Sequence, residues 1–536
     1  MRLRLLALFI LLGGSFTAIL CLTASSSIAR QNEGDPMATG IVYHDANGNQ
    51  RFDQGEKTLA GIRVSNGSQI TQTDARGRYR LPIDNDTIIF VIKPRGWRTP
   101  LNKNNNPVFY YIHKPHGSPA GLRYAGVAPT GPLPKSVDFP LYPQEEPDQF
   151  RAIMFGDPQP RNQQEIDYIA HDVIEELAGT DASLGVTLGD ILFDDLSLFE
   201  SQARTIGLVG IPWYNVIGNH DINLKATHDR YSDETFESHF GPSYYSFDHG
   251  SVHFLVLDNI EWIVTKPGEK GSYRAGLGAK QLAFVKRDLA LIPEKQLVVI
   301  MMHVPLIDTN DRQGLYRLIE KRPFCMSISG HTHHHEHRFI TREDGWQGPE
   351  PHHHVINVTV SGSWWSGAPD ARGIPHTMMA DGAPNGYSIL SFDGHKYSLD
   401  FKAASQPADY QMRIQAPEVI TADQAEKTDI YVNVFNGSER STVEMRLGKE
   451  GSWTLMERKV IGDPEFAALS AAGRANKTKD WHDLPAPKAC PHLWHAMLPK
   501  GTEPGTHMLQ VRTVDMHGRT YHGRRILRIK AAASKP

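Results

Sequence analysis

The chain has 536 residues, a formal net charge of -4 at pH 7, 40% hydrophobic residues and 22% charged residues. This length exceeds what one hydrophobic core normally organises, so two or three domains are expected, and the ordinary composition argues against a disordered chain. The chain has no long basic run, so its charge pattern does not indicate nucleic acid as a partner. Positive charge for a small anionic substrate would then come from a local source, such as bound metal ions.

The N-terminus predicts export. Arg2 and Arg4 precede an apolar run from Leu5 to Leu22, and small residues ending at Ser27-Ile28-Ala29 follow. This pattern is typical of a secretory signal peptide over residues 1–29, which implies a periplasmic or secreted protein. The apolar run is also long enough for an uncleaved membrane anchor. No second apolar segment of this kind follows, so no other transmembrane segment is expected.

Three cysteines give little basis for a disulfide framework. A lipid anchor at Cys21 fits less well than cleavage, because the residue before it, Leu20, is not small. If Cys21 leaves with the signal, Cys325 and Cys490 can form at most one bridge.

Residues 36–145 predict a small β-sandwich domain. Short β-prone runs such as Ile62–Val64, Gly77–Leu81 and Thr87–Ile92 alternate with Gly, Asn, Asp and Pro. The stretch from Pro140 to Asp148 is rich in Pro and Glu and is interpreted as a linker.

This domain also contains a calcium-loop pattern. Oxygen-bearing side chains stand at loop positions 1, 3, 5, 9 and 12, namely Asp45, Asn47, Asn49, Asp53 and Glu56. Position 6 is Gln50, where the sharp turn prefers Gly. Calcium binding and a turn held by Asx side chains are both consistent with this pattern.

Residues 146–403 change to an α/β rhythm. Arg151–Phe155 is an apolar strand, and Gln163–Leu177 has helical spacing. Further apolar strands end just before Asp190, Asn219, His303 and His331. Open α/β sheets place their ligand sites at such strand ends.

Residues 408–532 predict a second β-sandwich domain. The candidate strands are Ile430–Val434, Thr442–Leu447, His507–Val514 and Arg524–Ile529. Between them, Asp463–Lys488 is polar and Ala-rich, and is expected to be either a long loop or a short helical insertion.

Five short motifs in the α/β segment occur in a fixed order. They are Gly156-Asp157-Pro158-Gln159, Gly189-Asp190 with Asp194, Gly218-Asn219-His220-Asp221, Met302-His303-Val304-Pro305, and Gly330-His331-Thr332-His333. Hard oxygens and imidazole nitrogens suit paired first-row metal ions, and a Gly before each ligand would let the backbone turn sharply. In His331-Thr332-His333, an extended backbone would point both rings the same way.

Together these motifs resemble the calcineurin-like metallophosphoesterases. The resemblance covers about Phe150 to Phe401 and implies an α/β core, a metallophosphoesterase β-sandwich flanked by helices (αββα), with small all-β domains on both sides. It implies one ion held by Asp157, Gln159, Asp190 and His333, and a second held by Asp190, Asn219, His303 and His331. Two such ions, about 3.5–4 Å apart, can activate a water that attacks phosphorus in line.

The flanking segments extend the resemblance to an exported bacterial subgroup with β domains at both ends. The region from Gly40 to Val64 resembles secreted β-sandwich repeats of bacterial surface and carboxypeptidase-regulatory-type modules. Asp381-Gly382-Ala383-Pro384-Asn385-Gly386-Tyr387 and His492-Leu493-Trp494 also fit this subgroup.

The resemblance gives His220 a catalytic role instead of a metal-binding one. In this family the His of the GNH motif contacts phosphate and can protonate the leaving oxygen. Asp194 or Asp221 would orient its ring, although either carboxylate could equally cap a turn.

The first motif departs from the family pattern, because Gln159 stands where His is usual. An amide oxygen is a weaker and harder ligand, so Mn or Fe is favoured at this site, with Zn or Mg as alternatives. A second interpretation is that Gln159 only donates a hydrogen bond from outside the ligand set.

Two weaker signals remain open. The histidines His333-His334-His335, His337 and His352-His353-His354 are interpreted mainly as surface residues or supports of the metal ligands, with extra metal ligands as the alternative. Trp364 and Trp365 could stack on a leaving group or pack in the core.

The sequence therefore predicts an exported binuclear phosphoesterase acting on a small phosphate ester, with a phosphomonoesterase preferred. One alternative is a phosphodiesterase acting on lipid head groups, nucleotides or wall polymers. The other is a non-catalytic secreted binding or adhesion protein, which the β domains and the calcium-like loop would suit.

Overall fold

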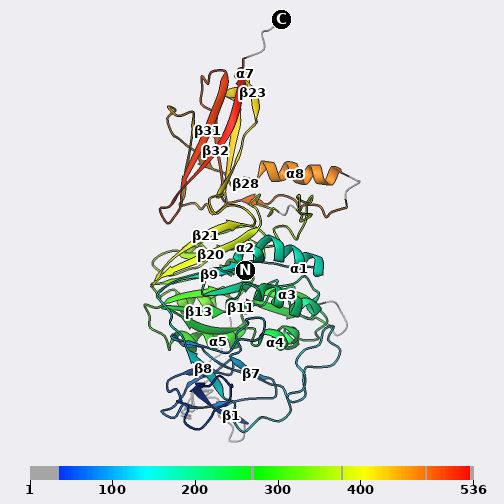
Figure 1. Ribbon diagram of the computed structural model, residues 1–536, viewed down its shortest axis with the longest axis vertical. Helices are drawn as coiled ribbons and strands as arrows, with labels where there is room; N and C mark the ends of the chain where they lie inside the picture. Colours follow the sequence, from blue (N-terminus) through cyan, green and yellow to red (C-terminus); the bar gives the residue numbers. More distant parts are fainter. Residues whose placement is uncertain (1–35, 267–270, 376–377, 477–479, 532–536) are drawn as a thin grey trace, which may run out of the picture.

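The computed structural model describes residues 36–266, 271–375, 378–476 and 480–531, so the predicted signal peptide lies outside the described residues. Figure 1 shows three parts along the long axis, with the N-terminal strands at one end, the α/β core in the middle and the C-terminal strands at the other end. No helix among the described residues combines the length and apolarity needed to cross a membrane.

Two sheets form the core. One contains, in spatial order, β11 (Trp213–Val216), β10 (Leu184–Leu188), β9 (Gln149–Phe155), β20 (Gly386–Asp393) and β21 (Lys396–Ala403). The other contains β12 (Tyr245–His249), β13 (Val252–Val256), β16 (Leu297–Met301), β17 (Cys325–Ser329), β19 (His352–Ile356) and β18 (Glu336–Ile340). Strands β9, β10 and β11 run parallel, and so do β13, β16, β17 and β19.

Helices cover both sheets. The first sheet packs against α3 (Phe199–Gly207) and a continuous helical segment made of α1 (Gln163–Ile169), a π-helical turn (Ala170–Ile174) and α2 (Glu175–Leu177). The second packs against α5 (Gly278–Leu289) and α6 (Arg312–Ile319). This is the predicted αββα arrangement, and the expected fold class is confirmed.

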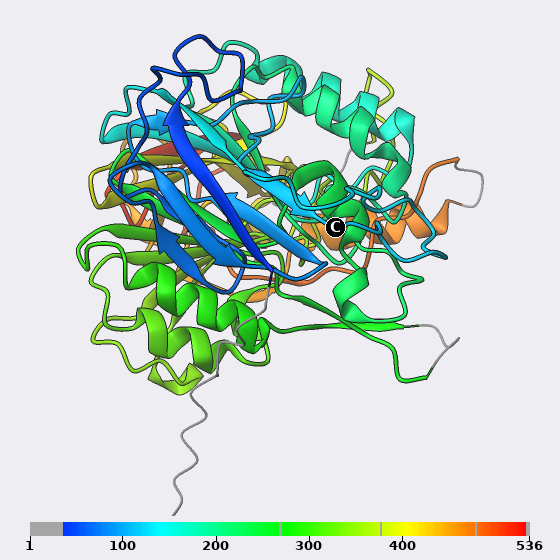
Figure 2. The ribbon, with the colours of Figure 1, turned by 90° about the horizontal axis from the view of Figure 1, so that it is seen from below.

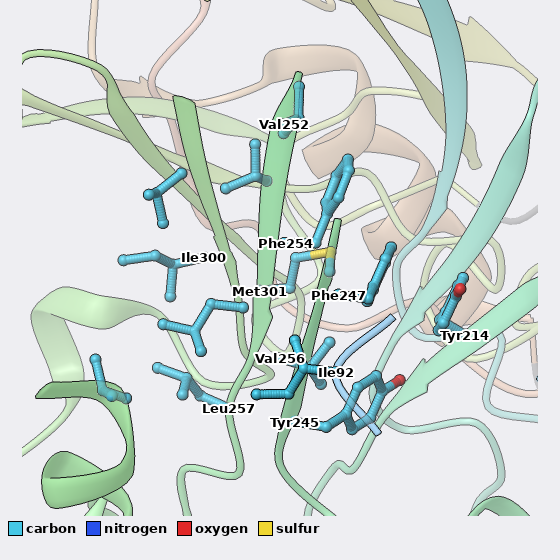
Figure 3. Packing of buried hydrophobic residues seen from close by; sticks show 14 of the residues in the cluster. Ile92, Tyr214, Tyr245, Phe247, Val252, Phe254, Val256, Leu257, Ile300 and Met301 are labelled. Atoms are coloured by element: carbon cyan, nitrogen blue, oxygen red, sulfur yellow. The ribbon is translucent and has the colours of Figure 1, made fainter. Parts of the chain in front are cut away.

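Apolar strands explain why the sheets are buried between other layers. Every residue of β13 and β16 is buried, as expected for strands covered on both faces. Figure 3 shows Phe254, Ile300 and Met301 in this core, with Ile92 of the N-terminal domain nearby. The N-terminal domain and the second sheet therefore share one hydrophobic cluster.

Two four-stranded sheets form the N-terminal domain. They are β4 (Arg78–Pro82), β1 (Met37–His44), β8 (Phe139–Pro143) and β6 (Trp97–Arg98), and β3 (Ile70–Gln72), β2 (Arg63–Ser65), β5 (Thr87–Val91) and β7 (Tyr110–His113). Figure 2, seen from below, shows these blue strands lying across the end of the core.

The interpretation of Pro140–Asp148 as a linker is wrong. Its first residues belong to β8, and Glu146 is buried, with Oε1 2.5 Å from the Lys93 ammonium. Glu146 Oε2 also accepts hydrogen bonds from the backbone N–H groups of Gly96 and Gly250. Composition suggested a flexible spacer, but the buried ion pair fixes this segment between the two domains.

A second buried network ties the N-terminal domain to the core. The Arg63 guanidinium lies 2.5 Å from Asp248 and 3.1 Å from Asp288. The ring of His253 bridges the same two carboxylates at 2.7 and 2.9 Å. Burial alone lowers the pKa of His253, but the two carboxylates raise it to about 9.

Two sheets form the C-terminal domain as well. One contains β22 (Met412–Gln415), β24 (Asp429–Val434), β30 (Leu493–Met497) and β27 (Glu457–Arg458), and the other β23 (Val419–Thr421), β32 (Thr520–Lys530), β31 (Gly505–Val514), β25 (Thr442–Leu447) and β26 (Thr454–Leu455). Their facing side chains form a separate hydrophobic cluster.

The segment Asp463–Lys488 contains a helix, α8 (Pro464–Ala475), which decides between the two sequence interpretations. Asp463 caps it by accepting from the N–H of Phe466, and Pro464 occupies the first turn. The nearby strands β28 (Ile461–Gly462) and β29 (Ala489–Cys490) pair with each other. Cys490 and Cys325 are both free thiols and form no bridge.

The remaining elements are short. They are a hairpin of β14 (Ile260–Ile263) and β15 (Ser272–Ala275), helices α4 (Glu234–Phe240) and α7 (Ala422–Ala425), and 3-10 turns at Leu196–Leu198, Asp229–Tyr231, Leu306–Asp308 and Arg342–Asp344.

We predict that His253 makes stability depend on pH. Because its folded pKa is raised above the ordinary value of 6.5, its contribution is fully present below pH 6.5 and is lost as pH rises through about 9. The full contribution is on the order of 3 kcal/mol. Urea unfolding should show the stability gap between wild type and His253→Gln narrowing from pH 6.5 to 9.5. A gap that stays constant over this range would contradict the prediction.

Candidate metal centre

Five parallel strands deliver polar side chains to one edge of the core. Asp157 follows β9, Asp190 follows β10 and Asn219 follows β11, while His303 and His331 follow β16 and β17. All except His331, which is partly buried, are buried. The carboxyl ends of the two sheets thus meet at one point, as the sequence pattern predicted for a ligand site.

The His303 ring is the centre of one group of donor atoms. Its Nε2 lies 3.1 Å from Asn219 Oδ1, 3.2 Å from His331 Nδ1 and 3.2 Å from Asp190 Oδ1. Asp190, His303 and His331 form a trio whose donor atoms lie close enough to hold one ion.

A second group adjoins it. Gln159 Oε1 lies 2.9 Å from His333 Nε2, and the Gln159 amide nitrogen donates to Asp190 Oδ2 at 3.1 Å. Asp157 Oδ1 lies 3.7 Å from the same His333 nitrogen. The structure therefore gathers the seven predicted metal-binding residues into two adjacent groups that share Asp190.

Backbone carbonyls fix which ring nitrogens face the site. His303 Nδ1 lies 2.9 Å from the oxygen of Leu188, and His333 Nδ1 lies 2.6 Å from that of Gly362. A carbonyl can only accept, so both Nδ1 atoms donate. When the rings are neutral, each Nε2 carries a lone pair that faces other acceptor atoms, an arrangement that a metal ion stabilises. Without an ion, burial lowers the pKa of His303 but Asp190 raises it to about 9, so a bound metal would take the place of the Nε2 proton.

Charge supports the same conclusion. Asp157 and Asp190 are both buried, and burial raises the pKa of Asp157 to about 7. The pKa of Asp190 is lowered because the nearby histidines outweigh its burial. Two buried carboxylates with amide and imidazole donors are the ligand set that hard divalent or trivalent ions prefer, so these residues fit the implied metals.

The backbone of the centre is unusually strained. Eleven non-Gly residues with positive φ are described, and eight of them lie in the loops of this site: Asp157, Gln159, Asp190, Asp194, His331, His333, Trp364 and Trp365. Such conformations cost about 1–3 kcal/mol each and are typical of functional sites.

Two expectations about local geometry need correction. His331 and His333 have φ of 77° and 50°, so they project from a left-handed turn and not from an extended strand. The sharp turn expected at the motif glycines is found at Gly189, with φ 87°, but Gly156, Gly218 and Gly330 do not have positive φ. Close packing is the other reason for glycine: a Cβ at Gly189 would lie 2.4 Å from the His303 ring, and one at Gly330 2.3 Å from Asp157 Oδ2.

The ring of His220 lies beside the donor groups without joining them. Its Nδ1 is 2.7 Å from Asp194 Oδ1, and its backbone N–H donates to Asp190 at 2.9 Å. Phe193 stacks on the ring with centroids 4.6 Å apart. Burial lowers the pKa of His220, but Asp190 and Asp194 raise it to about 9.

Asp194 therefore orients His220, and Asp221 has a different task. The Asp221 carboxylate accepts backbone N–H bonds from Ile191, Leu192 and Gly218. This geometry favours a structural role for Asp221 over a catalytic one, because its oxygens fix the loops that carry Asp190 and Asn219.

Comparison with known families agrees with this geometry. The family model described as calcineurin-like phosphoesterase matches residues 150–335, and the models for the N-terminal and C-terminal parts of the same family match residues 46–125 and 354–521. The chain belongs to the calcineurin-like phosphoesterases. It is a metal-dependent phosphoric ester hydrolase, as the sequence motifs predicted.

More distant comparisons add little. A purple acid phosphatase from yellow lupin (Lupinus luteus) seeds is 15% identical over 65% of this chain and 75% of its own, with a TM-score of 0.35. A superoxide reductase (neelaredoxin) from Ignicoccus hospitalis is 15% identical over 23% of this chain and 81% of its own, with a TM-score of 0.13. At these scores neither likeness bears on the fold or the activity. Comparison with curated proteins finds no match.

The tryptophan pair of this phosphoesterase divides into two roles. Trp365 is 2% exposed and its indole N–H donates to the Pro158 carbonyl, so it belongs to the core and cannot stack on a substrate. Trp364 is partly exposed and lies against the His333 ring, with centroids 4.1 Å apart. Only Trp364 stays a candidate substrate contact.

Most of the extra histidines are not surface residues, contrary to one sequence interpretation. His335, His337 and His352-His353-His354 are buried. His354 contacts the hydroxyls of Ser327 and Ser329, and His337 contacts His353 and Asn436. Among the described residues, none of these histidines joins a group that could hold an ion. They form a polar core behind the metal centre.

The calcium-like loop is closed by its own hydrogen bonds. Asp45 accepts from the N–H groups of residues 48, 49 and 50, while the amides of Asn47 and Asn49 donate to Asp53. Glu56 accepts from the N–H groups of residues 46 and 53. Gln50 adopts φ 59°, the conformation for which this position prefers Gly. Calcium binding here stays a prediction.

Sequence reasoning missed Lys488 of the C-terminal domain. Its ammonium donates to the carbonyl of Thr332, between His331 and His333, at 2.6 Å. Its backbone N–H donates to Ala380, whose own N–H donates to His333. No motif marked this lysine, because it reaches the centre from a segment more than 150 residues along the chain.

We predict that metal stoichiometry separates the two groups. Mn-loaded wild type should contain two ions per chain by elemental analysis, Gln159→Ala about one, and Asp190→Asn less than one, because Asp190 contacts both groups. The Asp195 carboxylate accepts a hydrogen bond from Ser197 and belongs to neither group. The control variant Asp195→Asn should therefore keep both ions. Two ions in Asp190→Asn would show that this carboxylate does not bridge.

Proposed function

We propose that this phosphoesterase is an exported enzyme that uses two metal ions to hydrolyse phosphate monoesters. The observation that carries the proposal is the set of lone pairs around His303 Nε2, where Asn219, His331 and Asp190 converge within 3.2 Å. When bound there, metal ions supply positive charge for the phosphate oxygens and lower the pKa of a coordinated water.

Each group around this centre has a task in the proposed reaction. Asp157, Gln159, Asp190 and His333 would hold one ion, and Asp190, Asn219, His303 and His331 the other, with manganese or iron preferred because Gln159 offers a hard amide oxygen. His220, oriented by the 2.7 Å contact with Asp194, would donate a proton to the leaving oxygen.

The preference for monoesters rests on charge. A phosphate monoester carries about two negative charges near neutral pH, whereas a diester carries one. Lys488 brings a cation to the loop between His331 and His333. The guanidinium of Arg161 also lies nearby, over Phe193, but Glu165 offsets its charge at 3.0 Å. The Lys488 ammonium suits the more highly charged substrate.

Export rests on sequence alone. The basic start, apolar run and small residues of positions 1–29 support action in the periplasm or after secretion. A purely adhesive role is disfavoured, because a binding module has no need for strained metal-site loops and a paired His220.

His220→Ala should lower kcat by at least about 100-fold while keeping both metal ions, because it removes the proton donor and no ligand. Asp194→Asn should lower kcat about tenfold or more through loss of ring orientation. Hydrolysis of 4-nitrophenyl phosphate and metal content would be measured together. Normal turnover in His220→Ala would exclude it as the proton donor.

Wild type should hydrolyse 4-nitrophenyl phosphate with a higher kcat/KM than bis(4-nitrophenyl) phosphate in the presence of Mn. Lys488→Gln should raise KM for the monoester about tenfold, because one charge-assisted hydrogen bond to the substrate is lost. The same variant should raise KM for the diester less. Lys500→Gln, an exposed lysine of the same domain, serves as the control. A strong preference for the diester would overturn the monoesterase assignment.

A further inference from the structure

The C-terminal domain exposes one face of its larger sheet. Along β32 the burial alternates, so that Leu527 and Ile529 point into the domain core while Arg524, Ile526 and Arg528 point outward. On the neighbouring strands Gln510 of β31 and Arg446 of β25 lie on the same outer side. We name the outward residues Arg446, Lys449, Gln510, Arg512, Arg524 and Arg528 the cationic face.

This face is strongly basic in a chain that is acidic overall. Five of its six residues are Lys or Arg, whereas the whole chain has a net charge of -4. Within the face, Arg512 is paired with Glu444 of β25 at 2.7 Å. In the described part of the chain, no acidic partner is seen for the side chains of Lys449, Arg524 or Arg528.

The basic residues border a hollow. A cavity of about 530 Å³ is lined by Arg446, Lys449, Met508, Gln510, His522 and Arg524, among others. In the strand register, Gln510 of β31 lies opposite Arg446 of β25 on one side and opposite Arg524 of β32 on the other. The three residues therefore form one row across the sheet. Adjacent strands are about 4.8 Å apart, which places the two arginine backbones about 10 Å apart across the hollow.

The nearby aromatic side chain is already occupied. The guanidinium groups of Arg446 and Arg512 lie 4.6 and 4.4 Å from the Trp453 ring centroid. Nucleic acid bound without sequence preference needs free aromatic rings on which bases stack, and Trp453 does not offer one. A flat bilayer surface also fits a hollowed face poorly. A flexible anionic chain fits both the charge and the shape.

We propose that the cationic face binds an acidic polysaccharide. The carboxylate or sulfate groups of such a chain would pair with Arg446, Arg524 and Arg528, while Gln510 holds the Arg446 guanidinium through its amide oxygen at 3.1 Å. This binding is independent of the metal centre and of the proposed hydrolytic function. Figure 1 shows β31 and β32 in the C-terminal domain, beyond the core sheets that carry the metal ligands. The face would hold the enzyme on a polymer while the core acts on small esters.

Binding of the full chain to alginate, a polymer of uronic acids, tests the proposal, with neutral dextran of similar length as the reference. Wild type should bind alginate but not dextran, and more weakly as salt increases. The double variant R524E/R528E should bind at least tenfold more weakly, and the milder R524Q/R528Q should show a smaller loss. R78E/R80E, the same charge change at exposed residues of β4, should bind like wild type.

Each variant should hydrolyse 4-nitrophenyl phosphate at the rate of wild type, which would show that its fold is intact. Equal loss of alginate binding in R78E/R80E would show that only total charge matters and would overturn the assignment of the face. Absence of alginate binding in wild type would overturn it too. So would binding to phosphatidylglycerol vesicles or to a single-stranded oligonucleotide in preference to alginate.

Discussion

At the carboxyl ends of five parallel strands, lone pairs of carboxylate, amide and imidazole groups face one another across about 3 Å, and the rest of the core is arranged to keep them there. Leu188 and Gly362 fix the rings of His303 and His333 through their carbonyls. Glycines at 189 and 330 leave room for the neighbouring donors. The left-handed backbone at Asp157, Asp190 and His333 is costly, and the metal ions that the site would hold offset both this strain and the buried negative charge.

The flanking domains are coupled to this centre by buried polar contacts. On the N-terminal side, Glu146 pairs with Lys93, and Arg63 contacts the two carboxylates that His253 bridges. On the C-terminal side, His492 contacts Asp381, and Asp381 accepts the N–H of His335, two residues after His333. Lys488 holds the turn between the two metal-site histidines. The C-terminal domain therefore braces the loop that supplies ligands to both groups of donors.

Sequence reasoning was strongest where local pattern determines structure. Apolar strands that end in polar residues predicted the sheets and a ligand site at their carboxyl ends, because strand ends of parallel sheets meet. The set of seven metal-binding residues was implied by the resemblance of the five motifs to a known family, and their metal binding stays a prediction. It failed where contacts are distant. Composition made Pro140–Asp148 resemble a linker, although Glu146 is buried against Lys93. Runs of His looked exposed, although His352–His354 lie on β19, an interior strand of its sheet, and His335 and His337 are buried against Asn436 of the C-terminal domain. The cationic face has no basic run, because its charges alternate with core residues along β32.

The two groups of facing side chains are arranged to hold two metal ions. Anomalous diffraction from crystals of the full chain loaded with manganese tests this directly. We expect two peaks about 3.5–4 Å apart with the Asp190 carboxylate between them, one beside Gln159 and His333 and the other beside Asn219, His303 and His331. A single peak, or peaks away from Asp190, would contradict the account.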